Sequence, residues 1–390
     1  MHAIDPAAWD ALLARQTHPS PFMRHAYLAA LQDSGSATSR TGWAARYFAL
    51  WQGDVLAAAC VLYLKAHSRG EYVFDWAWAD AYARHGLEYY PKAVLAVPFT
   101  PVPGTRLLAR DAPARQALLQ QVLAWCQGQG LSSLHLLFAS EEDLACAQQA
   151  GLMQRQTVQF HWHNQHPQQQ RRRFTDFDDF LHSLSQDKRK KIRQERRRVA
   201  EAGVTFRVRQ GRDIGAADWD FFYACYERTY WEHGNPPYLT RDFFTRMAAR
   251  MPQAWLLFIA EREGQPIASS LIALGADLHG DEGQKDQNIG VAYGRYWGAL
   301  ERVDCLHFEA CYYQPLAWCI AQGVQRFEGG AQGEHKLARA LLPTPAGSAH
   351  WLAHPAFAQA VDEFLQRERA GVVQYLQALD AHSPFRQMAQ

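Results

Sequence analysis

The chain has 390 residues, which is too many for one compact core and predicts two domains of ordinary size. Hydrophobic residues make up 48% of it and charged residues 20%, a balance typical of a globular protein. The net charge of +1 excludes a global attraction to nucleic acid or to anionic membranes, so any such affinity must be local.

The first 165 residues contain a regular succession of apolar runs and turn residues. The turn Gln52-Gly53-Asp54 separates two strand-like runs and predicts a hairpin. In chain order the sequence predicts helices at 9–16 and 22–33, hairpin strands at 46–51 and 55–64, a strand at 93–99, a helix at 111–127, a strand at 133–139, a helix at 141–149 and a strand at 154–163. A helix between two strands predicts a parallel crossover inside a mixed sheet.

The connector 166–173 (HPQQQRRR) is polar, has no apolar period and predicts a boundary between domains 1–165 and 166–390. A basic linker helix is expected at 187–199. A similar order then repeats, with helices at 219–231 and 240–250, hairpin strands at 255–262 and 266–274, a polar loop at 280–287, a strand at 289–296, a helix at 305–322 and a strand at 324–328. The repetition predicts two α/β domains in tandem.

The seven cysteines are odd in number and include no CxxC pair, which favours reduced thiols in the cytosol. Residues 1–10 contain Asp5 and Asp10 and no apolar core, so they do not resemble a signal peptide. The longest strongly apolar run, 55–64, has about half the length that a membrane helix requires. We therefore expect a cytoplasmic protein without a membrane span.

Several motifs carry a resemblance to known families. The order hairpin, strand, helix, strand resembles the GNAT fold of acyl-CoA-dependent N-acyltransferases. The stretch from Leu184 to Arg198, followed by Ala202-Gly203-Val204, resembles the serine, basic helix and Gly-Val signature of Fem-type (FemAB-like) aminoacyltransferases of peptidoglycan synthesis. Segments 72–77, 307–314 and 328–336 are similar to a bacterial group of predicted N-acyltransferases described as peptidoglycan biosynthesis or recognition proteins.

The resemblance covers nearly the whole chain and implies tandem GNAT-like domains. It also implies an N-acyltransferase that moves an activated acyl group, from an acyl-CoA type donor, to a primary amine, with cell-wall metabolism as one setting. Many GNAT enzymes hold the CoA pyrophosphate in a Gly-containing loop that opens a helix, and Arg295-Tyr296-Trp297-Gly298-Ala299-Leu300 matches that loop only in part. Two alternatives stay open: a Fem-type transferase that takes aminoacyl-tRNA, which lacks the loop too, and a non-catalytic module that recognises peptidoglycan precursors.

Acyl transfer to an amine needs a base for the attacking nitrogen and donors for the oxyanion. Glu309 lies on an apolar, aromatic predicted helix, one turn from Tyr312 and Tyr313. Burial among aromatic rings would raise the pKa of its carboxyl, as a base requires. The alternative is a glutamate that anchors a hydrogen-bond network in the core.

The segment 328–336 (EGGAQGEHK) follows the last predicted strand. The three glycines Gly329, Gly330 and Gly333 would let the backbone approach a substrate closely. Gln332 is a further candidate for substrate binding. Glu334, His335 and Lys336 then offer a base, a proton shuttle and an oxyanion or phosphate partner. An ordinary surface turn is the alternative.

Two further regions contain candidate binding residues. Asp75, Trp76 and Trp78 would form a substrate-binding lip if the segment 75–80 is extended, with both indoles on one face. The basic stretch predicts an anion site for CoA phosphates, tRNA or an anionic glycan carrier, with Lys188, Arg189, Lys191, Arg193 and Arg197 as its candidates. Arg295, from the partial match to a pyrophosphate loop, is a further candidate for anion binding. Both regions are also consistent with solvated surface. His161 and His163 share a strand face, but no third metal ligand is apparent and no metal is expected.

These residues predict one reaction centre in the second domain, in a slot where parallel strands diverge. Glu309 or Glu334 would be the base, Lys336 or His335 would support the oxyanion, and Tyr313 would be the acid for the leaving group.

Overall fold

The structure, a computed structural model, describes residues 1–169, 172–276, 289–331, 333–380 and 382–386. The chain divides into two compact units. Unit 1 comprises 1–158, 238–243 and 345–375, and unit 2 comprises 159–237, 244–344 and 376–390. The sequence places one boundary at 165/166, whereas the chain crosses between the units several times. Whether either unit folds as an independent domain stays a prediction.

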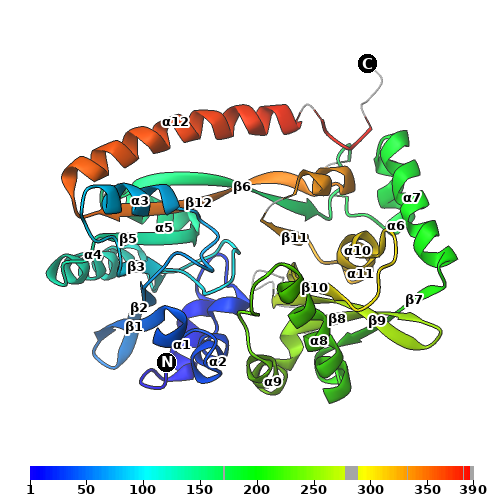
Figure 1. Ribbon diagram of the computed structural model, residues 1–390, viewed down its shortest axis with the longest axis horizontal. Helices are drawn as coiled ribbons and strands as arrows, with labels where there is room; N and C mark the ends of the chain where they lie inside the picture. Colours follow the sequence, from blue (N-terminus) through cyan, green and yellow to red (C-terminus); the bar gives the residue numbers. More distant parts are fainter. Residues whose placement is uncertain (170–171, 277–288, 332, 381, 387–390) are drawn as a thin grey trace. The chain divides into compact units, whose positions relative to one another are not determined.

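Figure 1 labels most of the helices and strands that follow. Up to residue 163 they are α1 (Pro6–Ala14), η1 (Pro21–Met23), α2 (His25–Asp33), η2 (Ser39–Thr41), β1 (Trp43–Gln52), β2 (Val55–Lys65), α3 (Trp76–Arg84), β3 (Lys92–Leu95), β4 (Leu108–Ala109), α4 (Ala112–Gly128), β5 (Ser133–Ala139), α5 (Glu141–Gln149) and β6 (Met153–His163). The later elements are α6 (Phe177–Ser183), α7 (Gln186–Glu201), β7 (Val204–Gln210), η3 (Gly211–Asp213), α8 (Ala216–Glu232), α9 (Arg241–Arg250), η4 (Pro252–Ala254), β8 (Trp255–Arg262), β9 (Gln265–Ala276), β10 (Ile289–Ala299), α10 (Leu306–Phe308), η5 (Glu309–Tyr313), α11 (Gln314–Ala321), β11 (Arg326–Ala331), η6 (Glu334–Arg339), β12 (Leu342–Leu352) and α12 (Pro355–Asp380).

Unit 1 contains a mixed sheet in the order β1-β2-β3-β5-β12-β6, with β4 beside β2. The predicted hairpin is confirmed as the antiparallel pair β1–β2. The predicted crossover is confirmed too, because β3 and β5 run parallel and α4 connects their ends. Apolar residues of α4, among them Leu118 and Val122, pack in one core with Leu134 and Leu136 of β5.

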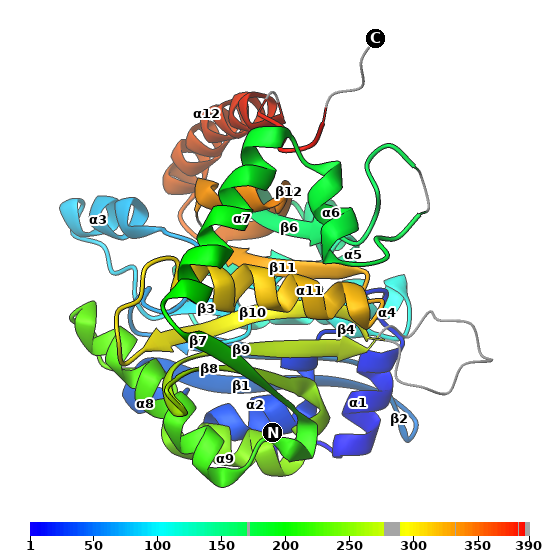
Figure 2. The same cartoon turned by 90° about the vertical axis from the view of Figure 1, so that its right-hand side faces the viewer.

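Unit 2 contains the sheet order β6-β11-β10-β9-β8-β7. Here β8 and β9 form the second predicted hairpin, and β10 and β11 are parallel and connected through the helical segment 306–321. Helix α8 covers one face of this sheet, and α10 and α11 cover the other (Figures 1 and 2). Consecutive residues of β9 meet the two layers, since Ser269 lies beside Cys225 of α8 and Ser270 beside Cys311 of η5.

The sequence did not predict α3, β7, β12 or α12, and it predicted one continuous helix at 305–322 where a π-helical turn, η5, separates α10 from α11. A π turn inserts an extra residue into the helix and is common at functional sites. The predicted polar loop 280–287 lies outside the described residues.

No helix in the described part of the chain is long and apolar enough to cross a membrane. All seven cysteines have free thiols, and five of them are buried.

Candidate active site

Strands β10 and β11 separate in the middle of unit 2. They pair only from Val291 to Tyr293 against 326–328. Beyond that point β10 continues beside β9, with a register shift between Gly294 and Tyr296, and β11 continues beside β6. A bulge of this kind bends a strand away from its neighbour. The predicted divergence of two parallel strands is therefore present in unit 2.

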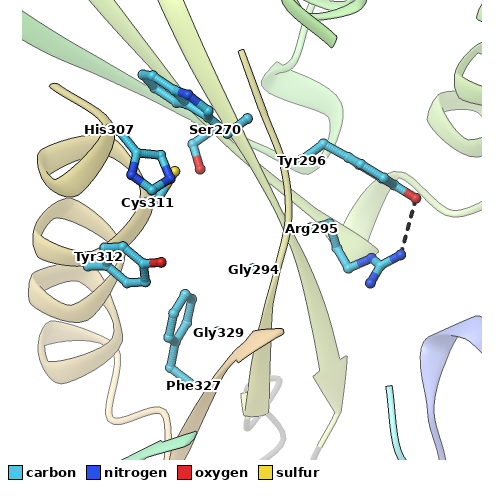
Figure 3. Close-up of a pocket in the computed structure, with 10 residues that line it drawn as sticks. Ser270, Gly294, Arg295, Tyr296, His307, Cys311, Tyr312, Phe327 and Gly329 are labelled. Carbon is cyan, nitrogen blue, oxygen red and sulfur yellow. Dashed lines mark hydrogen bonds between the residues drawn. The ribbon is translucent and has the colours of Figure 1, made fainter. Parts of the chain in front are cut away.

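A pocket of about 140 Å³ opens where the two strands separate. Figure 3 shows its wall, to which β10, β11 and the helical segment 306–313 all contribute. The residues that line it are Ser270, Gly294, Arg295, Tyr296, Trp297, His307, Cys311, Tyr312, Phe327 and Gly329. Three sequence-predicted site residues, Arg295, Tyr312 and Gly329, are among them.

A phenol and an imidazole meet at this wall. The hydroxyl of Tyr312 lies 3.1 Å from Nε2 of His335, close enough for a hydrogen bond. Burial, with the nearby Arg339 and Lys336 cations, lowers the pKa of His335 below its ordinary value of 6.5. Burial also lowers the pKa of His307, another pocket residue, to about 4. Both imidazoles are therefore neutral near pH 7 and able to accept a proton.

Lys336 lies next to the same wall. Its ammonium donates to the carbonyl oxygen of Gly330 at 3.0 Å, and a side chain on Gly329 would come within 3.5 Å of its Cδ. Burial lowers the pKa of Lys336 to about 8, while the nearby Cys311 acts in the opposite direction. A cation that titrates close to neutral pH, beside a pocket, can stabilise developing negative charge.

Glu309 and Tyr313 have other partners. Both carboxylate oxygens of Glu309 lie 3.2 Å from Nε of Arg196, and Gln314 donates to the carboxylate at 2.7 Å. Tyr313 is fully buried and donates its phenol hydrogen to Glu195. Within the described part of the chain, the pocket lining includes neither Glu309 nor Tyr313. Glu309 thus fits the alternative that the sequence left open, a glutamate that anchors a hydrogen-bond network.

The Gly-rich segment is only partly described. Gln332 lies outside the described residues, as does the side chain of Glu334, whose backbone begins η6. A Cβ on Gly329 would lie 2.3 Å from Cδ2 of Leu341, so a larger residue would force that side chain to move. Gly330 has a φ of +83°, which favours glycine.

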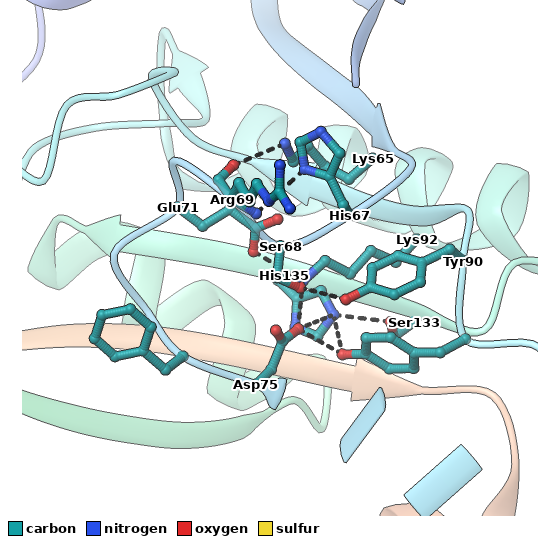
Figure 4. Close-up of polar contacts among 12 residues, drawn as sticks. Lys65, His67, Ser68, Arg69, Glu71, Asp75, Tyr90, Lys92, Ser133 and His135 are labelled. Atoms are coloured by element: carbon teal, nitrogen blue, oxygen red, sulfur yellow. Dashed lines mark hydrogen bonds and ion pairs between the residues drawn. The ribbon is translucent and has the colours of Figure 1, made fainter. Parts of the chain in front are cut away.

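The predicted lip at Asp75, Trp76 and Trp78 is not extended, because residues 76–84 form helix α3. Asp75 is buried in unit 1, where it pairs with the Lys92 ammonium (Figure 4). It also accepts a hydrogen bond from Tyr89 at 2.7 Å. Burial alone would raise the pKa of Asp75, but the Lys92 charge holds it below its ordinary value. Trp78 is buried, whereas Trp76 is 44% exposed, so the two indoles do not form one surface.

The predicted basic helix is α7. One of its faces is buried, and most of its cations lie outside that face. Ile192, Glu195 and Val199 are buried, at the i, i+3, i+7 spacing of one helix face. Arg193, with 52% of its side chain exposed, and Arg197, with 69%, form long, exposed ion pairs of 3.9 Å with Asp178 and 3.6 Å with Glu201. Lys188 and Arg189 are partly exposed, and Lys191 is exposed.

The partial match to a pyrophosphate loop, 295–300, is not a loop. Residues up to Ala299 belong to β10, which pairs with β9 on both sides of a register shift at Arg295, and the backbone N–H of Leu300 donates to the Ile267 carbonyl oxygen at 2.7 Å. A strand does not present the cluster of free N–H groups that a helix N-terminus offers to a pyrophosphate. Arg295 itself lies at the pocket, with Nη2 3.2 Å from the hydroxyl of Tyr296.

The parallel pair of unit 1 has a different environment. The parallel pairing of β3 with β5 ends at Leu95 and Leu136. Beyond it, the buried guanidinium of Arg106 donates to the carbonyl oxygens of Leu137 at 3.1 Å, Gly104 at 3.2 Å and Val102 at 2.5 Å. An arginine side chain therefore fills this position in unit 1.

Sequence reasoning missed seven of the ten lining residues, among them Ser270, His307 and Cys311, and it also missed the ion pair of Glu195 with Arg339. The burial of Glu195 could have been predicted from the sequence, because this acidic residue shares a helix face with the apolar Ile192 and Val199 in an otherwise basic helix. Among the described residues, no group of three or more His, Cys, Asp or Glu side chains is placed to hold a metal ion.

A family model described as FemAB-like, peptidoglycan biosynthesis/recognition, matches residues 1–387. No curated protein matches the sequence. Among solved structures, FemX is similar with a TM-score of 0.55 and 10% identity, over 92% of this chain and 98% of FemX.

The C-terminal domain of a putative lysylphosphatidylglycerol synthetase from Agrobacterium fabrum has a TM-score of 0.52 and 12% identity, over 93% of this chain and 96% of that one. A tandem GNAT protein from the clavulanic acid biosynthesis pathway has a TM-score of 0.43 and 12% identity, over 90% of this chain and 95% of that one. The predicted fold class, a mixed α/β fold, is confirmed by the strand order and by the likeness to FemX.

Proposed function

Because this chain belongs to the FemAB-like family of peptidoglycan biosynthesis and recognition proteins, we propose that it is a transferase that moves an activated acyl group to a primary amine. The reaction centre is the pocket between β10 and β11. The observation that supports this best is the Tyr312–His335 contact beside the Lys336 ammonium, at the point where two parallel strands separate.

In this proposal the attacking amine enters the pocket beside Tyr312. As the nitrogen bonds to the acyl carbon, its proton passes to the phenol oxygen, and the phenol proton passes to Nε2 of His335. The Lys336 ammonium stabilises the oxyanion. When the tetrahedral intermediate collapses, the bond to the leaving group breaks and the imidazolium returns the proton to it through Tyr312. A buried phenol remains protonated between these steps, since burial raises the pKa of Tyr312 above its ordinary value.

The donor is a CoA thioester or the aminoacyl ester of a tRNA, and both carry phosphate groups. Two observations favour aminoacyl-tRNA: residues 295–299 belong to strand β10 and not to a pyrophosphate loop, and α7 presents exposed cations. In this proposal Lys188, Arg189, Lys191, Arg193 and Arg197 bind phosphates of the donor, and Arg295 orients its reactive end.

The first prediction concerns Lys336. In Lys336→Met the ammonium is lost while the aliphatic stem is kept, so the rate of transfer should fall by roughly 10²- to 10³-fold, the usual effect of losing one oxyanion donor. Donor binding, followed as a thermal shift, should change little. Transfer would be measured with acetyl-CoA and with mixed aminoacyl-tRNA as donors and muropeptides as acceptors.

Lys65→Met is the matched control, because Lys65 is also a buried lysine whose pKa burial lowers, to about 7, but it lies in unit 1, outside the pocket. It should keep the wild-type transfer rate. A Lys336→Met variant that transfers as fast as wild type would remove Lys336 from the reaction.

The same assay separates the alternative function, recognition without catalysis. A thermal shift with muropeptides, no shift with either donor and no transfer would identify a binding module. Transfer from acetyl-CoA but not from aminoacyl-tRNA would reverse the choice of donor.

A further inference from the structure

The buried face of α7 contains one carboxylate, that of Glu195. It lies between Ile192 and Val199 on the apolar face, and its side chain is 8% exposed. A buried carboxylate is costly unless it is paired and hydrogen-bonded. Glu195 satisfies both conditions, because it accepts the phenol hydrogen of Tyr313 and lies 2.8 Å from Nη2 of Arg339.

Arg339 extends the contact toward the pocket. Its Nη1 donates to the backbone carbonyl oxygen of His335 at 2.7 Å, and its guanidinium carbon lies 3.6 Å from the ring centroid of Phe308. The Arg339 side chain is only 2% exposed, so these contacts are made away from water. In such surroundings an ion pair is much stronger than at the surface.

His335 completes the path, since its Nε2 contacts the Tyr312 hydroxyl at the pocket wall. The path therefore runs from Glu195 through Arg339 and His335 to Tyr312. Arg339 and His335 both belong to η6, a short helical turn that also contains Lys336. The contact of Arg339 with the His335 carbonyl anchors this turn, beside the bond from Lys336 to the Gly330 carbonyl.

We propose that Glu195 is a positioning residue, which through Arg339 holds His335 and Lys336 of η6 in place against Tyr312 and the pocket. Its kinetic consequence rests on the proposed transferase function, whereas its structural consequence can be measured in the protein without any substrate.

Glu195→Gln keeps the shape and removes the charge. The groups that face His335 are Tyr312, His307, Phe308, Arg339 and Lys336. The charge of Arg339 would then lack its counter-ion, so the pKa of His335 should fall further below 6.5 than in wild type. The measurement is an NMR titration of the histidine rings, with His335 assigned by its loss in His335→Asn.

In the transfer assay Glu195→Gln should lower kcat by about tenfold or more and change KM by less than about twofold, since orientation and not binding is affected. Arg339→Lys tests the same path from its other end: it keeps the charge but cannot contact Glu195 and the His335 carbonyl at once. If the two residues act together, the double variant should be no slower than the slower single variant.

Glu201→Gln is the matched control on the same helix, because Glu201 is exposed and its ion pair is with the exposed Arg197, at 3.6 Å. It should leave both the titration and the kinetics unchanged. An unchanged or raised pKa of His335 in folded Glu195→Gln would overturn the proposal, as would additive kinetic effects of the two single variants.

If Glu195→Gln does not fold, Arg339→Lys decides the question alone: wild-type kcat and a wild-type His335 titration would refute the path. Should the wild-type protein transfer nothing from either donor, the proposed function fails, while the His335 titration still tests the positioning.

Discussion

His335 and Lys336 are neighbours in sequence, and burial lowers the pKa of both. The consequences differ because the proposed reaction needs a neutral His335 to accept a proton and a charged Lys336 to stabilise the oxyanion. Below its lowered pKa, His335 is protonated and cannot accept a proton. Above about pH 8, Lys336 loses the charge that would stabilise an oxyanion.

The rate of transfer should therefore depend on pH as a bell. It should rise with pH through a value below 6.5, as His335 becomes neutral, and fall as pH passes about 8, as Lys336 loses its proton. Lys336→Arg should remove the alkaline decline, since arginine remains charged throughout this range. The measurement is kcat/KM between pH 5 and 10, and a decline near pH 8 that persists in Lys336→Arg would exclude Lys336 as its source.

For Glu309, the sequence predicted the position and the burial of the side chain but not its ion-pair partner. Sequence spacing correctly placed it one helical turn from Tyr312, and its burial was expected as well. Its partner Arg196 lies 113 positions away in sequence, on α7, and nothing local to either residue predicts that ion pair. A carboxylate held by a guanidinium is a weaker candidate for a base than the spacing alone indicated.

At the scale of elements, β10 and α8 approach closely at Gly298. A Cβ on this residue would lie 2.0 Å from the backbone carbonyl oxygen of Cys225 in α8. Thr229 of α8 also donates to the carbonyl oxygen of Trp297 at 3.0 Å. The spacing between this helix and this strand therefore depends on the absence of a side chain.

Gly298→Ala should force α8 away from β10 and lower the free energy of unfolding by about 1–3 kcal/mol, the usual cost of overpacking. Gly371→Ala is the contrasting substitution, because Gly371 lies in the exposed interior of α12 with no atom within 4 Å of a new Cβ. It should stabilise the protein by roughly 0.5–1 kcal/mol through helix propensity. Urea unfolding midpoints would test both, and equal midpoints would refute the close approach.

At the scale of the whole molecule, unit 1 is completed by a segment from the end of the chain. Strand β12 pairs with β5, and in that pair the Nδ1 atoms of the buried His135 and His350 rings lie 2.8 Å apart. Val361 and Leu365 of α12 pack in one core with Trp78 of α3. Arg155 also forms two hydrogen bonds of 2.8 Å with Glu368.

A fragment of residues 1–165 should therefore not fold alone, although the sequence predicted it as a domain. Without 345–375, β5 keeps β3 on one side but loses β12 on the other, and the apolar face of α3 is exposed. Circular dichroism and urea unfolding should show no cooperative transition, and a synthetic peptide of residues 345–375 should restore one. A cooperative transition in the fragment alone would show that the predicted boundary is sufficient.

The sequence by itself determined part of the local structure of this protein, including both hairpins, the crossover helix α4, the basic helix and the turn that contains His335 and Lys336. Periodicity and turn residues are local signals, and they suffice for elements of this kind. The resemblance to FemAB-like proteins was also present in the sequence, and the family match over residues 1–387 confirms it.

Only the tertiary structure decided which of these residues meet. The separation of β10 from β11, the ion pairs of Glu195 and Glu309 with distant arginines, and the completion of unit 1 by 345–375 all join positions far apart in the chain. Such contacts depend on the packing of whole elements, and no local pattern encodes them. For the same reason Asp75 and Trp78, predicted at a substrate lip, lie in the core of unit 1.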